Sequence, residues 1–181
     1  MSLLLATLLP GIFLALLGGL LVWGDPRVSS TAKALPRSKR GAQLFFGLGA
    51  LWFLWRLTRL GEADLIFFQT PTYVIIGFGV LALLAYFYTP DFLAVRGLCV
   101  LMLLAAEPLL YAAYMEFAHP QRLLMVSAVY LGLAAALYLA AAPYRLRDFF
   151  EWLFLRPNRA RLAGGLLLFY GLATVAAAFT Y

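Results

Sequence analysis

The stretch that decides the fold class is the first one, residues 2–23, which reads SLLLATLLPGIFLALLGGLLVW and contains no charged side chain. A helix rises 1.5 Å per residue, so about twenty apolar residues in helical form cross the hydrocarbon core of a bilayer. No basic residue precedes this run, it is longer than a signal-peptide core, and no A-x-A cleavage pattern follows it. We therefore expect a transmembrane helix that the mature protein retains.

The rest of the chain repeats this pattern. Of its 181 residues 65% are hydrophobic and 12% are charged, whereas ordinary soluble domains have about 25% charged residues. Continuous apolar runs also exclude a β-barrel, whose strands alternate apolar and polar residues over about ten positions. The sequence therefore predicts an all-α integral membrane protein, a six-span transmembrane helix bundle that forms a single domain. The predicted spans are residues 2–23, 43–60, 71–88, 97–115, 122–141 and 162–181.

One boundary between the predicted spans is open. Residues 65–68, which lie between the second and third spans, are apolar enough to extend either helix or to lie in the membrane interface. Elsewhere proline marks the ends of spans, with Pro90 in the turn before the fourth span and Pro143 after the fifth.

Basic residues set the predicted orientation. The net charge is +6, and most Lys and Arg residues fall in two groups between apolar runs, which indicates membrane topology rather than nucleic-acid binding. These are Arg27, Lys33, Arg37, Lys39 and Arg40 in the first group and Arg145, Arg147, Arg156, Arg159 and Arg161 in the second. By the positive-inside rule both groups are cytoplasmic, so an even number of spans places both termini outside. Arg greatly outnumbers Lys, and Ala, Leu and Gly dominate, which favours a GC-rich bacterial genome and hence the bacterial inner membrane.

The most informative single residue is Glu107. It stands ten positions into the predicted fourth span, about 15 Å deep and near the bilayer centre, where a charged side chain costs at least about 2.5 to 3.5 kcal/mol. We expect Glu107 to face the bundle interior, with Tyr111 and Tyr114 on the same helical face. Such a stripe can form a proton or cation site, or it can hold a neutral glutamic acid that donates an interhelical hydrogen bond.

Two arginines lie near the outer end of the second span. Arg56 and Arg59 stand on the side where the positive-inside rule disfavours them. They can extend to the outer headgroups, or Arg56 can reach Glu107 as a buried ion pair. Extension to the headgroups needs no special geometry and is the expectation.

Residues 144–155 form a predicted amphipathic helix that lies in the cytoplasmic interface before the last span. Leu146, Phe149, Phe150 and Leu153 form one side of it, opposite Arg147, Asp148 and Glu151. The helix either docks a partner subunit or anionic lipid, or anchors the re-entry of the chain into the membrane. The candidate docking residues are Arg147, Phe149, Phe150 and Trp152.

The fifth span carries a stripe of small residues, spaced four apart, that allows another helix to approach closely. The residues are Ala128, Gly132, Ala136 and Ala140. We expect this stripe to pack inside the bundle, although a helix from another chain can also use it.

Residues that carry chemistry are scarce. Cys99 is the only cysteine and His119 the only histidine, so we expect no disulfide, no metal site and no cofactor. Catalytic motifs are absent as well, and a membrane enzyme is not expected. The preferred hypothesis is therefore an accessory or scaffold subunit of a larger membrane assembly, whose partners are the lipid bilayer and other subunits or itself. The alternative is a small ion- or proton-coupled transporter or channel, homo-oligomeric and dependent on Glu107.

Overall fold

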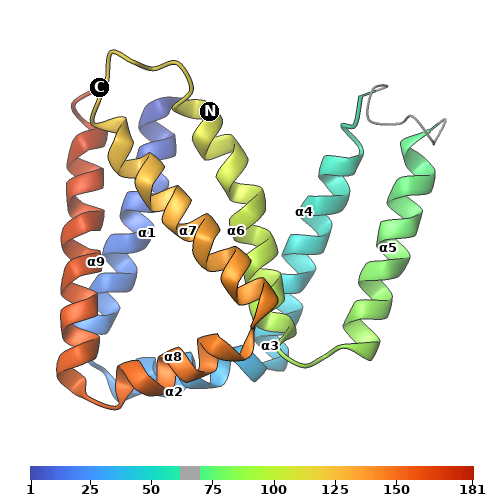
Figure 1. Cartoon of the computed structure of the whole chain (residues 1–181), viewed down its shortest axis with the longest axis horizontal. Coiled ribbons are helices and arrows are strands. Elements are labelled where there is room, and N and C mark those ends of the chain that lie inside the picture. Colours follow the sequence, from blue (N-terminus) through green and yellow to red (C-terminus); the bar gives the residue numbers. More distant parts are fainter. Residues whose placement is uncertain (62–69) are drawn as a thin grey trace.

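The computed structural model describes residues 1–61 and 70–181, and within these ranges all regular structure is helical. The helices are α1 (Leu3–Trp23), α2 (Pro26–Ala34), a 3-10 helix (Leu35–Arg37), α3 (Lys39–Gly41), a π-helix (Ala42–Phe46), α4 (Gly47–Leu57), α5 (Pro71–Tyr88), α6 (Leu93–Ala112), α7 (Arg122–Ala141), α8 (Tyr144–Phe154) and α9 (Pro157–Ala178). Figure 1 shows their arrangement.

Five helices in the described part of the chain are long and apolar enough to cross a membrane, namely α1, α5, α6, α7 and α9. The predicted all-α class is confirmed, and these helices indicate an integral membrane protein. The predicted second span is divided into the π-helix Ala42–Phe46 and the shorter α4. The open boundary at residues 65–68 lies outside the described residues.

The predicted fourth and sixth spans start later than the helices do, and in both cases basic residues were placed outside the span. Both helices also end three residues before the predicted spans. α6 begins at Leu93, four residues before the predicted start, and it contains the exposed Arg96. α9 begins at Pro157, so Arg159 and Arg161 lie in its first turns rather than in a loop. A long guanidinium side chain can reach the headgroups while its backbone continues the helix, so a basic residue does not mark the end of a span.

The basic segment after α1 also differs from its loop-like composition, because most of it is helical. The Asp25 side chain accepts a hydrogen bond of 2.7 Å from the Arg27 backbone N–H, and Pro26 occupies the first helical position. This combination of an N-cap and a following proline starts α2 directly after the left-handed residue Gly24.

The closest helix pair joins the two ends of the chain. α1 and α9 run antiparallel along their whole length, as Figure 1 shows on the left. A Cβ atom on Gly18 would clash with the backbone nitrogen of Leu168, and a Cβ atom on Gly164 would lie 2.7 Å from the Leu21 Cβ. The two backbones therefore touch where only glycine fits.

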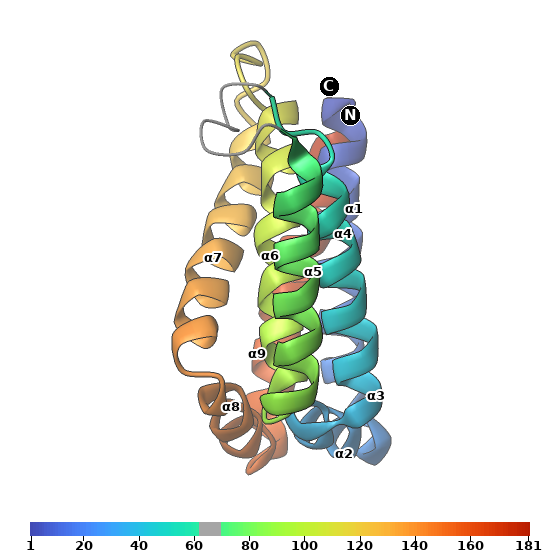
Figure 2. The same cartoon turned by 90° about the vertical axis from the view of Figure 1, so that its right-hand side faces the viewer.

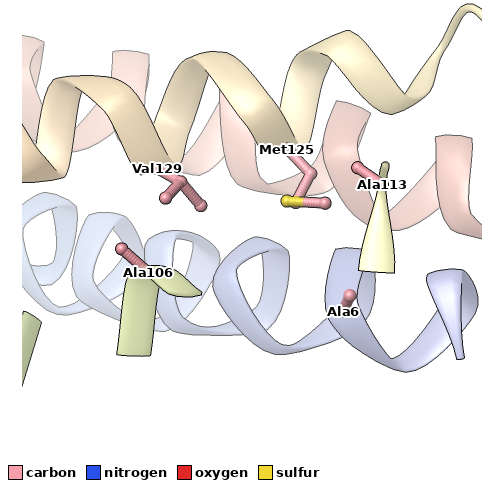
Figure 3. Packing of buried hydrophobic residues seen from close by; sticks show 5 residues of the cluster. All are labelled: Ala6, Ala106, Ala113, Met125 and Val129. Carbon is pink, nitrogen blue, oxygen red and sulfur yellow. The ribbon is translucent and has the colours of Figure 1, made fainter. Parts of the chain in front are cut away.

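α6 and α7 cross beside this pair. Between them and α1 lies a small apolar core, shown in Figure 3, formed by Ala6, Ala106, Ala113, Met125 and Val129. The π-helix and α4 pack on the other side of α6. There a Cβ atom on Gly97 would clash with the backbone of Phe46 in the π-helix. Figure 2 shows α4, α5 and α6 running side by side in projection, whereas Figure 1 shows that α5 stands apart from α6.

The two ends of the bundle differ in structure. α2, α3 and α8 lie across one end, and both chain termini lie at the other, as Figure 1 shows. Both groups of basic residues that were identified in the sequence therefore lie at the same end.

Candidate functional site

Arg56 and Glu107 form an ion pair between α4 and α6. The Arg56 Nη2 lies 2.5 Å from both carboxylate oxygens of Glu107. The contact depends on the close packing of α4 on α6, where Gly49 faces Val100 and Gly97 faces the π-helix. We expected Arg56 to extend to the headgroups, whereas the structure shows the alternative, the pair with Glu107. It is not buried, however, because the side chains are 42% and 59% exposed.

The expected depth of Glu107 and its expected orientation need correction. α6 ends at Ala112, so Glu107 lies five residues, about 8 Å, from the end of the helix rather than at its centre. Arg56 is the last residue but one of α4. The pair thus lies toward the end of the bundle that also holds the chain termini, and the two charges compensate each other without burial inside the chain.

Tyr111 and Tyr114 do not line an interior face either. They are 77% and 69% exposed, and Tyr114 lies beyond the end of α6 in the turn that leads to α7. Tyr111 follows Glu107 by one turn within α6, whereas the expected helical spacing does not apply to Tyr114 because the helix ends at Ala112. The four residues of the expected polar site therefore reduce to one ion pair with two outward-facing tyrosines beyond it.

His119 also has a partner. Its ring lies 5.2 Å from the ring of Tyr181, and the Tyr181 hydroxyl is 3.0 Å from the Thr7 hydroxyl. This contact ties the α6–α7 connection to the C-terminus and to α1, which is a structural role.

The small-residue stripe of α7 packs partly inside the chain. Ala136 is buried in a cluster with Val95 and Cys99 of α6, and a Cβ atom on Gly132 would lie 3.5 Å from Met102. Ala140, in contrast, is exposed. The stripe therefore serves α6 in its middle and leaves its last residue free.

The candidate docking residues on α8 face in different directions. Leu146 and Leu153 are buried and Phe150 packs beside them, so these residues fix α8 to its own bundle. Phe149 and Trp152 are exposed and stack on each other, with ring centroids 6.1 Å apart.

The positive charge of Arg147 is compensated by acidic residues within α8. Its Nη2 lies 2.7 Å from the Asp148 carboxylate, and Glu151 lies 3.9 Å from its Nε. The hydrogen bonds that Arg147 donates to Asp148, and then the negative charge of Asp148, raise the pKa of Arg147, so this side chain stays cationic and paired.

An apolar cavity of about 610 Å³ lies between α1, α4, α6 and α7, and the sequence did not predict it. Phe13, Trp52, Leu101, Leu109 and Gly132 line it together with other apolar residues. No sequence signal could have found it, because the cavity depends on how four helices are spaced.

The interior of the described chain contains little polar chemistry. Its buried polar side chains are Thr7 and Thr174, and each donates a hydrogen bond to a carbonyl of its own helix. Among residues 1–61 and 70–181 there is no group of three His, Cys, Asp or Glu side chains that could hold a metal ion.

Comparisons with protein-family models, with curated proteins and with solved structures gave no match to this chain.

Proposed function

We propose that the chain is a six-span protein of the bacterial inner membrane that acts as a non-catalytic accessory or scaffold subunit of a larger membrane assembly. Helical backbone continues without interruption from Lys39 through the π-helix to Leu57, which is long enough to span the membrane as the sixth helix. An even number of crossings is consistent with both termini lying at the same end of the bundle. The positive-inside rule then makes the end with α2 and α8 cytoplasmic, and the termini lie outside.

The observation that carries the scaffold hypothesis is how little of α5 its own chain covers, although Tyr86 at its end packs on the cluster of Ala42, Leu93 and Ala94. None of the eighteen residues of α5 is buried, whereas 28% of the best spanning window of α1 and of α9 is buried. Its described contact with α4 includes the edge-to-face pair of Phe53 and Phe78, with centroids 5.3 Å apart. A helix that its own chain covers so little offers its surface to another subunit.

The glycines of α5 support the same hypothesis. A Cβ atom on Gly77 or Gly79 would meet nothing within 4 Å. Glycine in a helix costs about 1 kcal/mol relative to alanine, and no contact within the described chain offsets that cost. A neighbouring helix from another subunit, which can approach closely at small residues, would offset it.

Two experiments test the proposal. Cysteines placed at the exposed positions Ser30 and Asn158 should resist a membrane-impermeant label in intact cells and react after permeabilisation. Efficient labelling of both positions in intact cells would show that the topology is the reverse of the proposed one. Purification in mild detergent should recover a foreign subunit in stoichiometric amount, and recovery of the isolated chain alone would contradict the subunit role.

A homo-oligomeric transporter or channel is the second candidate, and the Arg56–Glu107 pair is the observation that favours it. The nearly apolar interior leaves no polar conduit through the described part of one chain, so a pathway would have to form between copies. Under this hypothesis Glu107→Gln assembles normally but loses flux or its pH dependence in proteoliposomes. Under the scaffold hypothesis the variant retains its assembly partner, and wild-type proteoliposomes show no flux.

A further inference from the structure

The outer flank of α8 combines aromatic and basic side chains. Arg145, Phe149 and Trp152 follow one another at intervals of four and three residues, which places them along one side of α8. Arg156 lies two residues beyond the end of the helix. Leu146 and Leu153, about a quarter of a turn away around the helix, are buried against the bundle. The flank is therefore a second surface of α8 that the chain itself does not cover.

The arginines of this flank keep their charge uncompensated. Arg147 takes both acidic residues of α8, Asp148 and Glu151. In the described part of the chain Arg145, Arg156 and Arg159 have no carboxylate within ion-pair distance. Three cations without an ion-pair partner thus lie on α8, in the turn after it and in the first turn of α9.

Arg159 is held in place beside Trp152. Its guanidinium carbon lies 4.8 Å from the centre of the indole ring, and its Nη1 donates a hydrogen bond of 3.3 Å to the Trp152 carbonyl. These contacts fix one cation next to the exposed ring, while its remaining N–H groups stay available to an acceptor.

The position of α8 determines which partner fits. α8 lies across the ends of the spanning helices, as Figure 1 shows, at the level where a bilayer changes from hydrocarbon to headgroups. Aromatic rings favour this depth, and arginine binds phosphate oxygens through two parallel hydrogen bonds. A protein partner would need to bring carboxylates to this depth, whereas an anionic phospholipid already has its phosphate there.

We infer that the flank formed by Arg145, Phe149, Trp152, Arg156 and Arg159 is a binding site for the phosphate headgroup of an anionic phospholipid. The arginines bind the phosphate, and Phe149 and Trp152 contact the glycerol and the upper acyl chains.

Native mass spectrometry of the purified protein, titrated with phosphatidylglycerol or phosphatidylcholine, tests this inference. The wild type should bind phosphatidylglycerol preferentially. Arg145→Gln combined with Arg156→Gln removes two charges that have no ion-pair partner, and it should weaken phosphatidylglycerol binding by about 30-fold. The matched control, Arg27→Gln with Lys33→Gln in α2, removes the same charge at the same end and should change binding little.

Three outcomes would overturn the site. Equal binding of the two lipids by the wild type would show that no anionic headgroup is recognised. Equal losses in the two double variants would show diffuse attraction to the whole basic end. A Phe149→Ala and Trp152→Ala variant that keeps full binding and a normal elution volume would remove the aromatic contribution, and the combined site with it.

Discussion

The glycines of the α1–α9 pair lie in close helix contacts, whereas the glycines of α5 lie in open space. In the pair, added Cβ atoms on Gly11, Gly18, Gly164 and Gly171 would meet backbone or side-chain atoms of the partner helix at less than 3 Å. In α5, added Cβ atoms on Gly77 and Gly79 would meet nothing within 4 Å. The glycines of α1 and α9 thus contact a partner helix of the same chain, whereas Gly77 and Gly79 of α5 contact no helix of the described chain.

This difference distinguishes helices that stabilise the chain from a helix whose surface is open to other molecules. Membrane helices lack a hydrophobic driving force toward one another, so close backbone contact supplies much of their association. Such contact joins the two ends of this chain. The α1–α9 contact therefore contributes to the stability of the fold, whereas the described chain leaves α5 largely uncovered, as the proposed scaffold role requires.

The largest expected effect is at the α1–α9 contact. Gly18→Ala and Gly164→Ala should each destabilise the protein by about 1–3 kcal/mol, because the backbones must move apart to admit a methyl group. Thermal unfolding in detergent measures the loss as a lower Tm.

The chain offers a matched control for each of these variants. Gly19 and Gly165 are the next residues, and an added Cβ on either would meet nothing within 4 Å. Gly19→Ala and Gly165→Ala should leave the Tm unchanged or raise it slightly. If all four variants behave alike, close packing is not what holds the pair.

A smaller effect on stability, but a large one on association, is expected in α5. Gly77→Leu with Gly79→Leu should keep the Tm of the isolated chain, because both positions are open, and should abolish co-purification of the partner subunit. Gly19→Leu, which adds similar bulk to an open position of α1, should retain the partner. A Tm loss in the α5 variant as large as that of Gly18→Ala would show that α5 packs within its own chain.

The sequence predicted the apolar helices well because membrane spans need only length and continuous hydrophobicity. α5 and α7 have the bounds expected for them, and α8 forms the expected helix after Pro143. The interfacial position of α8 stays a prediction. The start of α2 was not predicted, because the segment was interpreted as a loop from its composition, although Asp25 and Pro26 are typical residues of a helix N-terminus.

The contacts between helices could not be predicted in the same way. Gly18 and Gly19 look alike in the sequence, yet only Gly18 faces α9. The Arg56–Glu107 pair requires α4 to lie beside α6, which hydropathy does not specify. The error in the depth of Glu107 followed from taking Arg96 as the end of a loop, although its side chain is exposed and its backbone is helical.

The smallest effect is expected at the ion pair that joins the α4–α5 hairpin to the bundle. Glu107→Gln should lower the stability by at most about 1 kcal/mol, because both partners are partly exposed. Gly97→Ala, at the backbone contact with Phe46, should cost more, about 1–3 kcal/mol. A double-mutant cycle with Arg56→Gln isolates the energy of the pair. A coupling above about 2 kcal/mol would show that charge rather than close packing attaches the hairpin.

The most direct test of the central claim, that α5 is an interaction helix, is site-specific photo-crosslinking in native membranes. A photoreactive amino acid replaces Ile76 on α5 or, in a control variant, Leu166 on α9, and both positions are exposed. We predict a discrete adduct with another polypeptide from position 76 and none from position 166. If position 76 labels only lipid while the membranes stay intact, α5 is a lipid-facing helix and the scaffold hypothesis is contradicted.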